Sequence, residues 1–450
     1  MEKINNDKLL AKANRFGQDA LKLHPFYRGK IEVTPKCRIR NLDDFSVWYT
    51  PGVAESCKLI KNNPSQVFQH TNKWNSVAVV TDGTRVLGLG DIGPEAGLPV
   101  MEGKALLFKY LGGVDAYPIC LDTKDPEEII KTVKLLKPSF GGINLEDIEK
   151  PKCFYILDRL REELDIPVWH DDQQGTATIE VAGAINALKV VGKKLSNASV
   201  SMVGAGAANI AIARILVAAG VNKKNIVMVD SKGILNLQRK DLEADKQNNP
   251  YKWDMCVNSN KEQKVGGIKE ALAGSDIVIA ASRPGPGTIL KSDVRGMASD
   301  AIVFASANPI PEIWPWEAKE AGAKIVATGR SDFPNQINNS LIFPGIFRGT
   351  LDVAARTITD EMCLAAVFEV AKVAEEKGLT EGYIVPSMDE KEVFSRQAVV
   401  VGLKAIEQGL ARVKLSKEEL LEKADQMINR SREQTKTMMK NGFIPEPPKD

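Results

Sequence analysis

Short runs of β-branched and apolar residues recur along this chain with helical stretches between them, and this alternation limits the possible fold more than any other feature. The runs occupy residues 76–82, 115–122, 141–147, 166–172, 199–206, 225–230, 276–282, 301–308 and 324–329. Strands that alternate with helices form parallel sheets, so the pattern predicts an α/β fold. Nearly every run ends on Asp, Glu, Asn, Ser or Gly. Ligands of open parallel sheets bind beyond the carboxyl ends of the strands, so these terminal residues are the candidates for chemistry.

The run at 199–206 leads into the motif GAGAAN, which predicts a dinucleotide-binding unit of the Rossmann type. The helical stretch IAIARILVAAG follows, and a second strand then ends at Asp230. Gly204 permits the turn and Gly206 lets the backbone approach a phosphate, while Asn209 replaces the third small residue and is expected to loosen the packing of helix on strand. The predicted binding loop comprises Gly204, Ala205, Gly206, Ala207, Ala208 and Asn209.

The residues after the second strand bear on the choice between NAD and NADP as the cofactor. Asp230 is placed to accept hydrogen bonds from a ribose. Ser231, Lys232 and Lys246 follow it and offer groups that neutralise a 2′-phosphate. The choice stays open, with a preference for NADP.

A second glycine motif, GLGDIG, matches the dinucleotide pattern in full but stands in a different context. Pro94 follows its last glycine directly, and Gly97 and Pro99 come soon after. We therefore expect no helix to begin there and no phosphate to bind. A tight glycine-rich loop that lines a cleft is the favoured interpretation.

Four carboxylates follow two of the predicted strands. Asp171 and Asp172 stand side by side, and Glu146 and Asp147 end an earlier run. Adjacent acids repel unless a cation, a shared proton or a lysine compensates, and hard oxygen ligands suit Mg²⁺ or Mn²⁺. The alternative for Glu146 and Asp147 is an ordinary acidic pair at a helix start. Zinc is disfavoured because the only histidines are His24, His70 and His170, and His170 is expected to be a packed residue.

The chain divides into three predicted parts. They are an α/β substrate and metal domain at 1–170, a Rossmann-type domain at 171–338, and a helical segment at 339–450 that packs back on the first. Sixty basic and 58 acidic residues leave a net charge of +2, which argues against nucleic acid or a membrane surface and favours a small-molecule partner. Six scattered cysteines and no signal peptide or transmembrane run predict a cytoplasmic protein.

Eight strings spread over most of the chain are informative when they are taken together. They are YTPGVA (49–54), TDGTRVLGLGDIG (81–93), GLPVMEGKALLFK (97–109), NLEDI (144–148), HDDQQGTA (170–177), VGAGAA (203–208), FASANP (304–309) and NNSLIFPG (338–345). In this order they resemble the malic enzyme family in its short form. The resemblance implies oxidative decarboxylation of malate to pyruvate and CO₂, with NADP or NAD and with Mg²⁺ or Mn²⁺. It also implies a homodimer whose active-site residues could come from both chains.

The resemblance assigns roles to individual side chains. The metal ligands would be Glu146, Asp147 and Asp172, while Asp171 would pair with Lys104. The other implied roles are general base for the C2 hydroxyl (Lys104), acid that protonates C3 of the enol (Tyr49), clamp on a substrate carboxylate (Arg85), and hydrogen bonds to the substrate (Asn308 and Asn338, or Asn339 in place of Asn338).

Elementary acid–base chemistry is compatible with these roles. A lysine with a pKa near 10.4 accepts a proton at neutral pH only if burial or a nearby cation lowers that pKa, and Asp171 acts in the opposite direction. A tyrosine with a pKa of about 10 stays protonated until a carbanion forms. Without the resemblance, Tyr49 would be taken for a buried aromatic residue beside Trp48, and Arg85 for a surface charge.

Three other functions remain possible from the sequence. They are an oxaloacetate decarboxylase with a regulatory nucleotide site, a malate dehydrogenase that releases no CO₂, and a non-catalytic nucleotide-binding regulator. A regulator would be expected to have lost Tyr49, Lys104 or the acidic ligands, and all of these are present.

Overall fold

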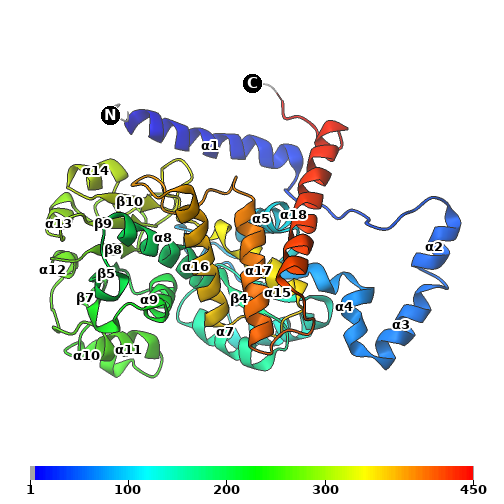
Figure 1. Cartoon of the computed structure of the whole chain (residues 1–450), viewed down its shortest axis with the longest axis horizontal. Coiled ribbons are helices and arrows are strands. Elements are labelled where there is room, and N and C mark those ends of the chain that lie inside the picture. The colour runs from blue at the N-terminus through cyan, green and yellow to red at the C-terminus, as the bar shows by residue number, and fades with distance from the viewer. Residues whose placement is uncertain (1–5, 449–450) are drawn as a thin grey trace.

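The computed structural model describes residues 6–448 and contains two sheets, which confirms the predicted α/β fold (Figure 1). All nine predicted strands form, together with a two-residue strand, β7, that was not predicted. The strands are β1 Ser76–Thr81, β2 Asp115–Cys120, β3 Gly142–Leu145, β4 Val168–His170, β5 Val200–Val203, β6 Ile226–Asp230, β7 Gly233–Ile234, β8 Ile277–Ala280, β9 Ile302–Ala305 and β10 Ile325–Thr328.

Helices account for most of the remaining chain. They are α1 Asn6–Tyr27, α2 Leu42–Trp48, α3 Val53–Asn62, α4 Val67–His70, α5 Pro94–Gly112, α6 Pro126–Leu136, α7 Lys152–Glu163, α8 Thr176–Val190, α9 Ala207–Ala219, α10 Lys240–Ala244, α11 Pro250–Asn258, α12 Ile268–Leu272, α13 Lys291–Arg295, α14 Pro315–Glu320, α15 Phe343–Asp352, α16 Asp360–Lys377, α17 Glu392–Glu407 and α18 Lys417–Lys440. Single 3₁₀ turns occupy Pro64–Gln66, Asn72–Asn75, Lys137–Ser139, Leu195–Asn197, Lys223–Asn225 and Asn339–Leu341.

The larger sheet has the Rossmann strand order. Its six strands run β10-β9-β8-β5-β6-β7, and all neighbours are parallel except β7, which pairs with β6 antiparallel. The strand order reverses between β5 and β8, which is where such sheets bind a ligand. The two-residue strand β7 was not predicted, because two residues are too few to show a periodic pattern.

The smaller sheet is fully parallel, with the order β2-β1-β3-β4. Every residue of β1 and β3 is buried, as expected for strands covered on both faces. The last strand, β4, leads through a wide π-type helical turn at Asp171–Gly175 into α8. Helix α8 therefore joins the carboxyl edge of one sheet to the other sheet.

The C-terminal helices cover both parts of the molecule. Helix α16 packs on α8 and α9, whereas α15 and α18 pack on α5 (Figure 1). The helical segment predicted at 339–450 is interrupted between its first two helices, since α15 ends at Asp352 and α16 begins at Asp360 after the N-cap Thr359. The Thr359 hydroxyl accepts a hydrogen bond from the backbone N–H of Met362.

The expectation that no helix starts after GLGDIG is wrong. Helix α5 begins at Pro94 itself, with Gly93 as its N-cap. Proline is favoured at the first helical position because the N–H that it lacks would have no partner there. Pro99 lies one turn further on and does not end the helix.

The segment that carries α2 and α3 projects away from the rest of the chain (Figure 1). Its apolar side chains are exposed instead of packed, among them Leu42, Phe45, Val47 and Trp48. None of the helices within residues 6–448 has the length and hydropathy needed to cross a bilayer.

Candidate active site

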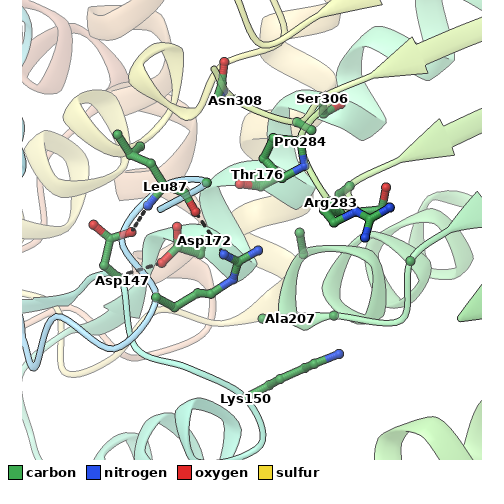
Figure 2. A pocket seen from close by; sticks show the side chains of 18 of the residues that line it. Leu87, Asp147, Lys150, Asp172, Thr176, Ala207, Arg283, Pro284, Ser306 and Asn308 are labelled. Atoms are coloured by element: carbon green, nitrogen blue, oxygen red, sulfur yellow. Dashed lines mark hydrogen bonds between the residues drawn. The ribbon is translucent and has the colours of Figure 1, made fainter. Parts of the chain in front are cut away.

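A cavity of about 700 Å³ lies between the carboxyl ends of the two sheets (Figure 2). One end is lined by residues that follow β1, β3 and β4, and the other by the loops after β5, β6, β8 and β9. The cavity thus joins the predicted metal ligands to the predicted nucleotide loop. Of the predicted site residues, it is lined by Arg85, Lys104, Glu146, Asp147, Asp172, Gly204, Ala205, Gly206, Ala207, Ala208, Asp230, Ser231, Asn308, Asn338 and Asn339.

The π-type turn sends the two adjacent aspartates in different directions. Asp171 is fully buried, whereas 37% of the Asp172 side chain is exposed and faces the cavity. Gly175 makes this possible, because a Cβ atom there would lie 2.1 Å from Oδ1 of Asp171. Wide helical turns of this kind are frequent at functional sites.

Lys104 reaches the buried aspartate from α5. Its Nζ lies 2.6 Å from Oδ2 of Asp171 and 3.0 Å from Oε1 of Glu146. The Asp171 carboxylate also accepts a hydrogen bond of 2.8 Å from Nε1 of Trp169. Burial by itself lowers the pKa of Lys104, but the carboxylates of Asp171 and Glu146 outweigh it and raise the pKa above its ordinary value. In this arrangement the amine of Lys104 therefore lacks the lowered pKa that a general base needs.

Three carboxylates lie close together beside the Lys104–Asp171 ion pair. One oxygen each from Glu146, Asp147 and Asp172 lies within 4.8 Å of the others. Burial raises the pKa of Glu146 well above its usual range, and burial followed by repulsion from Asp172 raises the pKa of Asp147 to about 8. Oδ2 of Asp147 is buried without a hydrogen-bond partner among the described residues.

This donor set fits a hard divalent cation. Oxygen ligands at such spacing suit Mg²⁺ or Mn²⁺, and a positive charge among them would offset both the repulsion and the desolvation. His170 is fully buried, with Nδ1 3.6 Å from Oδ2 of Asp172, and burial lowers its pKa. His170 is therefore packed behind the carboxylates, as we expected.

The GLGDIG loop closes the cavity on one side. The backbone N–H of Arg85 donates to the carbonyl of Asp147 at 2.9 Å, and the Arg85 guanidinium donates to the carbonyl of Leu87 at 3.1 Å. A Cβ atom on Gly88 would lie 2.6 Å from the Asn308 carbonyl oxygen. The absence of a side chain at Gly88 thus lets this loop touch the loop after β9.

Three asparagine residues line the cavity. Asn308 follows β9, and Asn338 and Asn339 precede α15. Oδ1 of Asn338 accepts from the backbone N–H of Ser340 at 3.0 Å, and its Nδ2 donates to the Gly329 carbonyl at 3.3 Å. Both Asn338 and Asn339 therefore remain candidates to contact a substrate.

The nucleotide loop has the predicted form, with one correction. Residues 204–208 line the cavity at the start of α9, whose first amides face it. Asn209 does not line it and does not loosen the packing. It is fully buried, and its Nδ2 donates to the carbonyls of Val203 and Gly204 at 2.9 and 2.8 Å, so the amide holds the loop together.

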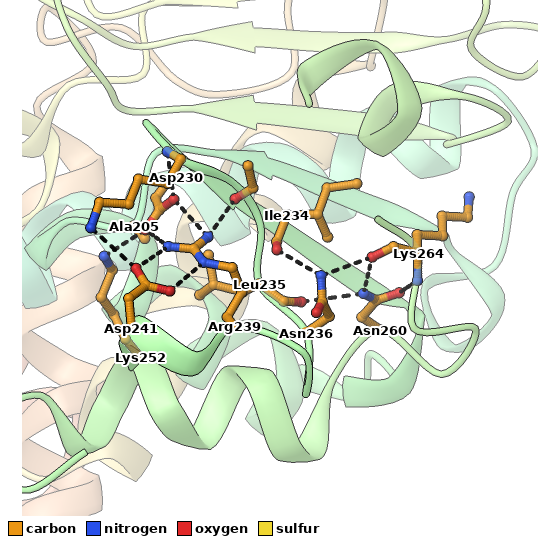
Figure 3. A network of polar contacts seen from close by, with 12 residues as sticks. Ala205, Asp230, Ile234, Leu235, Asn236, Arg239, Asp241, Lys252, Asn260 and Lys264 are labelled. Carbon is orange, nitrogen blue, oxygen red and sulfur yellow. Dashed lines mark hydrogen bonds and ion pairs between the residues drawn. The ribbon is translucent and has the colours of Figure 1, made fainter. Parts of the chain in front are cut away.

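The group around Asp230 differs from the sequence-based picture (Figure 3). Asp230 is held by Arg239, with contacts of 3.0 and 3.1 Å, and by Lys252 at 2.8 Å. Lys232 donates its backbone N–H to Asp230, but its Nζ lies 3.3 Å from Asp241 and the residue does not line the cavity. Lys246 is exposed and lies outside the cavity as well.

The cations that do line this end are Lys150, Lys252 and Arg283. The Nζ of Lys150 donates to the carbonyl of Ala205 in the nucleotide loop at 3.1 Å. Figure 2 shows Lys150, Arg283 and Ala207 among the residues that line this cavity. Lys150 directly follows the LEDIE string and Arg283 directly follows the strand run 276–282. Their positions just beyond strand ends could therefore have identified both as residues of the site. No sequence pattern pointed to Lys252 or Arg239, because helical packing places them.

Tyr49 is the predicted catalytic residue that the chain does not bring to the site. It follows α2 on the projecting segment, is 73% exposed, and does not line the cavity.

The cavity ends at the switch point of a Rossmann sheet on one side and at an amine among carboxylates on the other. This arrangement is typical of dinucleotide-dependent oxidoreductases. Residues 28–161 match the family described as "Malic enzyme, N-terminal domain", and residues 173–406 match "Malic enzyme, NAD binding domain". The chain belongs to the malic enzyme family.

Similar proteins agree with this assignment. A bifunctional malic/malolactic enzyme of Bacillus subtilis is 50% identical over 406 residues, which cover 90% of this chain and 97% of the relative. An NAD-dependent malic enzyme of Geobacillus stearothermophilus is 53% identical over 385 residues, covering 85% and 78%. The crystal structure of Entamoeba histolytica malic enzyme matches with a TM-score of 0.96 and 45% identity, covering 100% of this chain and 94% of that one.

Replacing Asp147 by Asn should stabilise the chain without a divalent cation and remove its stabilisation by Mn²⁺. The pKa of Asp147 is raised to about 8 in the folded state, so the folded state binds more protons than the unfolded state between about pH 4 and 8. The stability of the metal-free chain should thus fall as the pH rises through that range. At pH 8 in EDTA, Asp147→Asn should gain roughly 1–3 kcal/mol.

Thermal unfolding in EDTA and in Mn²⁺, from pH 5 to pH 8, measures both effects. Asp122→Asn removes an exposed carboxylate and is the control, for which neither the pH slope nor the Mn²⁺ response should change. A variant at Asp147 that still gains stability from Mn²⁺ as the unmodified chain does would contradict the assignment.

Proposed function

We propose that this protein oxidises and decarboxylates malate to pyruvate and CO₂, with reduction of a nicotinamide dinucleotide and dependence on Mg²⁺ or Mn²⁺. The observation that carries the proposal is the position of Lys104. Its amine contacts both Asp171 and Glu146, in the same cavity as the Gly204 loop. A hydroxyl group held there would lie between a base, a cation site and a hydride acceptor.

The proposed reaction uses the chain's own groups as follows. Arg85 and Asn308 bind the carboxylates of malate, and Lys104 takes the proton of the C2 hydroxyl as hydride leaves C2 for the nicotinamide. Loss of CO₂ leaves an enolate, which Tyr49 protonates at C3. When bound, a divalent cation would polarise the C2 oxygen and stabilise the developing negative charge.

A bound cation also answers the difficulty over the pKa of Lys104. Its amine is held in the protonated form first by Asp171, and then by Glu146 and Asp172, which would become cation ligands. A cation on Glu146, Asp147 and Asp172 would neutralise part of their field and lower the pKa of the amine. Asp171 then serves to orient the amine and to receive its proton.

The geometry favours this function over the alternatives. A regulatory nucleotide site needs no continuity with the acidic cluster, yet one cavity contains both. A malate dehydrogenase that retains CO₂ needs no cation next to the C2 oxygen, whereas three converging carboxylates supply a site for one. The three-part division at about residues 170 and 338 is retained in this proposal, with closure of the parts excluding water.

Lys104→Met should reduce malate-dependent coenzyme reduction by about 10²–10⁴-fold while coenzyme binding persists. The reason is loss of the proton acceptor at C2. Initial rates of NADH or NADPH formation and measured pyruvate, with and without Mn²⁺, give the result. Lys109→Met is the matched control, because Lys109 lies on the same helix and pairs with Asp115 outside this cavity. Formation of oxaloacetate in place of pyruvate by the unmodified chain would exclude the proposed decarboxylation.

We infer that a homodimer completes the site. Tyr49 is 73% exposed on a segment that projects from the chain, and the apolar side chains around it have no cover. A second copy that receives α2 and α3 would bury these side chains and place its own Tyr49-bearing segment reciprocally. Each site would then combine Lys104 of one chain with Tyr49 of the other.

A heterodimer of Tyr49→Phe and Lys104→Met chains tests this arrangement. If the two residues act across the interface, one of its two sites contains both native groups, so the purified heterodimer should have about half of the native activity. If both residues act within one chain, each site contains one substitution and activity stays at the level of the single variants. The two chains are co-expressed with different affinity tags, and both homodimers serve as controls.

We propose that NAD⁺ is the preferred coenzyme and that NADP⁺ is also accepted, which differs from the preference expected from Lys232 and Lys246. Asp230 stands at the tip of β6, where a carboxylate accepts hydrogen bonds from a ribose and repels a phosphate. Arg239 and Lys252 neutralise part of its charge, which leaves NADP⁺ admissible. The Geobacillus enzyme named NAD-dependent is 53% identical to this chain, whereas relatives named NADP-dependent are 40–43% identical and a second relative named NAD-dependent, from Rhizobium meliloti, is 40% identical.

Asp230→Ser should raise the ratio of kcat/KM for NADP⁺ to that for NAD⁺ by at least about tenfold, because it frees Arg239 and Lys252 to bind a 2′-phosphate. Steady-state kinetics with both coenzymes measure the ratio. Asp241 also contacts Arg239 but does not line the cavity, so Asp241→Ser should leave the kcat/KM ratio nearly unchanged. An unaltered ratio in Asp230→Ser would refute the role of this carboxylate.

A further inference from the structure

Glu180 is a buried carboxyl group for which the reaction above has no use. It lies on α8 at the wall of the cavity, eight residues after Asp172, and it is fully buried. Its Oε1 accepts a hydrogen bond from the hydroxyl of Ser306, and its Oε2 has no partner among the described residues. Burial raises the pKa of Glu180 to about 8. Burying a carboxyl group with one unpaired oxygen costs free energy. We therefore look for a role of this group in its hydrogen bond to Ser306.

Ser306 is placed where the nicotinamide end of a dinucleotide would lie. It directly follows β9, the second strand beyond the switch point, whereas the phosphate-binding glycines follow β5. In a Rossmann sheet the dinucleotide extends across this edge, with its nicotinamide over the half that contains β8 and β9. Figure 2 shows Ser306 on the same wall as Asn308 and Pro284, apart from Lys150 on the opposite side.

A second buried acid fixes the backbone around Ser306. The Glu312 carboxylate accepts from the backbone N–H groups of Ser282 at 2.8 Å and Ala307 at 3.1 Å. It therefore ties the loop after β8 to the loop after β9. Ser306 lines the cavity, and its hydroxyl is held by Glu180 while the backbone after β8 and β9 is held by Glu312.

We infer that Ser306 recognises the carboxamide group of the nicotinamide ring and that Glu180 is the positioning residue that orients it; the inference rests on the proposed use of a nicotinamide coenzyme. Because the Ser306 hydroxyl donates its hydrogen to Glu180, its oxygen is left to accept a hydrogen bond from the carboxamide NH₂. The pair would fix the rotation of the ring above the C2 position of the substrate. Half-buried Ser306 touches the coenzyme, and Glu180 acts through it.

The probe is 3-acetylpyridine adenine dinucleotide, in which a methyl group replaces the NH₂ and cannot donate. Dissociation constants for NAD⁺, this analogue and ADP-ribose are measured by calorimetry on the full chain with Mn²⁺ and without malate. The native chain should bind NAD⁺ more tightly than the analogue. Ser306→Ala and Glu180→Val should reduce that preference by up to about tenfold, and Glu180→Gln, which keeps an acceptor for the hydroxyl, should retain most of it.

ADP-ribose lacks the nicotinamide, so its affinity should stay unchanged in all three variants. A parallel loss of ADP-ribose and NAD⁺ affinity would show a purely structural role and overturn the inference, as would an unchanged preference in Ser306→Ala. If Glu180→Val does not fold, Ser306→Ala and Glu180→Gln decide. Absence of malate oxidation with the binding preference intact would count against the proposed reaction and leave this inference standing.

Discussion

The concentration of charge around Lys104 is the constraint on which the rest of the structure depends. If all are ionised, one amine faces the four carboxylates of Glu146, Asp147, Asp171 and Asp172, which leaves three negative charges in a largely buried space. Charges that are buried without compensation are costly, so the arrangement persists only because well-packed elements impose it. Helix α5 contributes the amine, the residues directly after β3 contribute one pair of acids, and the π-type turn after β4 contributes the other pair, so all of them meet at one sheet edge.

Helix α8 transmits this constraint to the coenzyme end of the cavity. Asp172, Thr176 and Glu180 are spaced four residues apart, so they lie along one face of the turn and of the helix that continues it. The first faces the cation site, and the third contacts Ser306 at the edge of the Rossmann sheet. Because α16 packs over α8, the C-terminal segment stabilises the helix that links the cation site to the coenzyme end of the cavity.

The sequence was informative where local pattern decides the structure. All nine strand runs, the glycine loop and the two pairs of acids could be predicted, because strand ends in a parallel sheet converge whatever joins them. The failures have a different physical origin. Arg239 and Lys252 reach Asp230 through the packing of α10 and α11, which no short motif encodes, and Pro94 begins a helix because the first helical position tolerates proline. A resemblance between motifs does not specify where Tyr49 lies in space, and the segment that carries it projects away from the rest of the chain.

The exposed position of Tyr49 and the charge on Lys104 lead to one further step of reasoning. Both groups are unready for the proposed reaction in the isolated chain, since one lies outside the site and the pKa of the other is held above its ordinary value. In the function proposed above, a second chain would supply the first group, and a divalent cation would lower the pKa of the second. The single chain would therefore bind a dinucleotide at the Gly204 loop, which is already formed, before it is competent for chemistry. Catalysis would thus depend on assembly and on cation binding, whereas nucleotide binding would depend on neither.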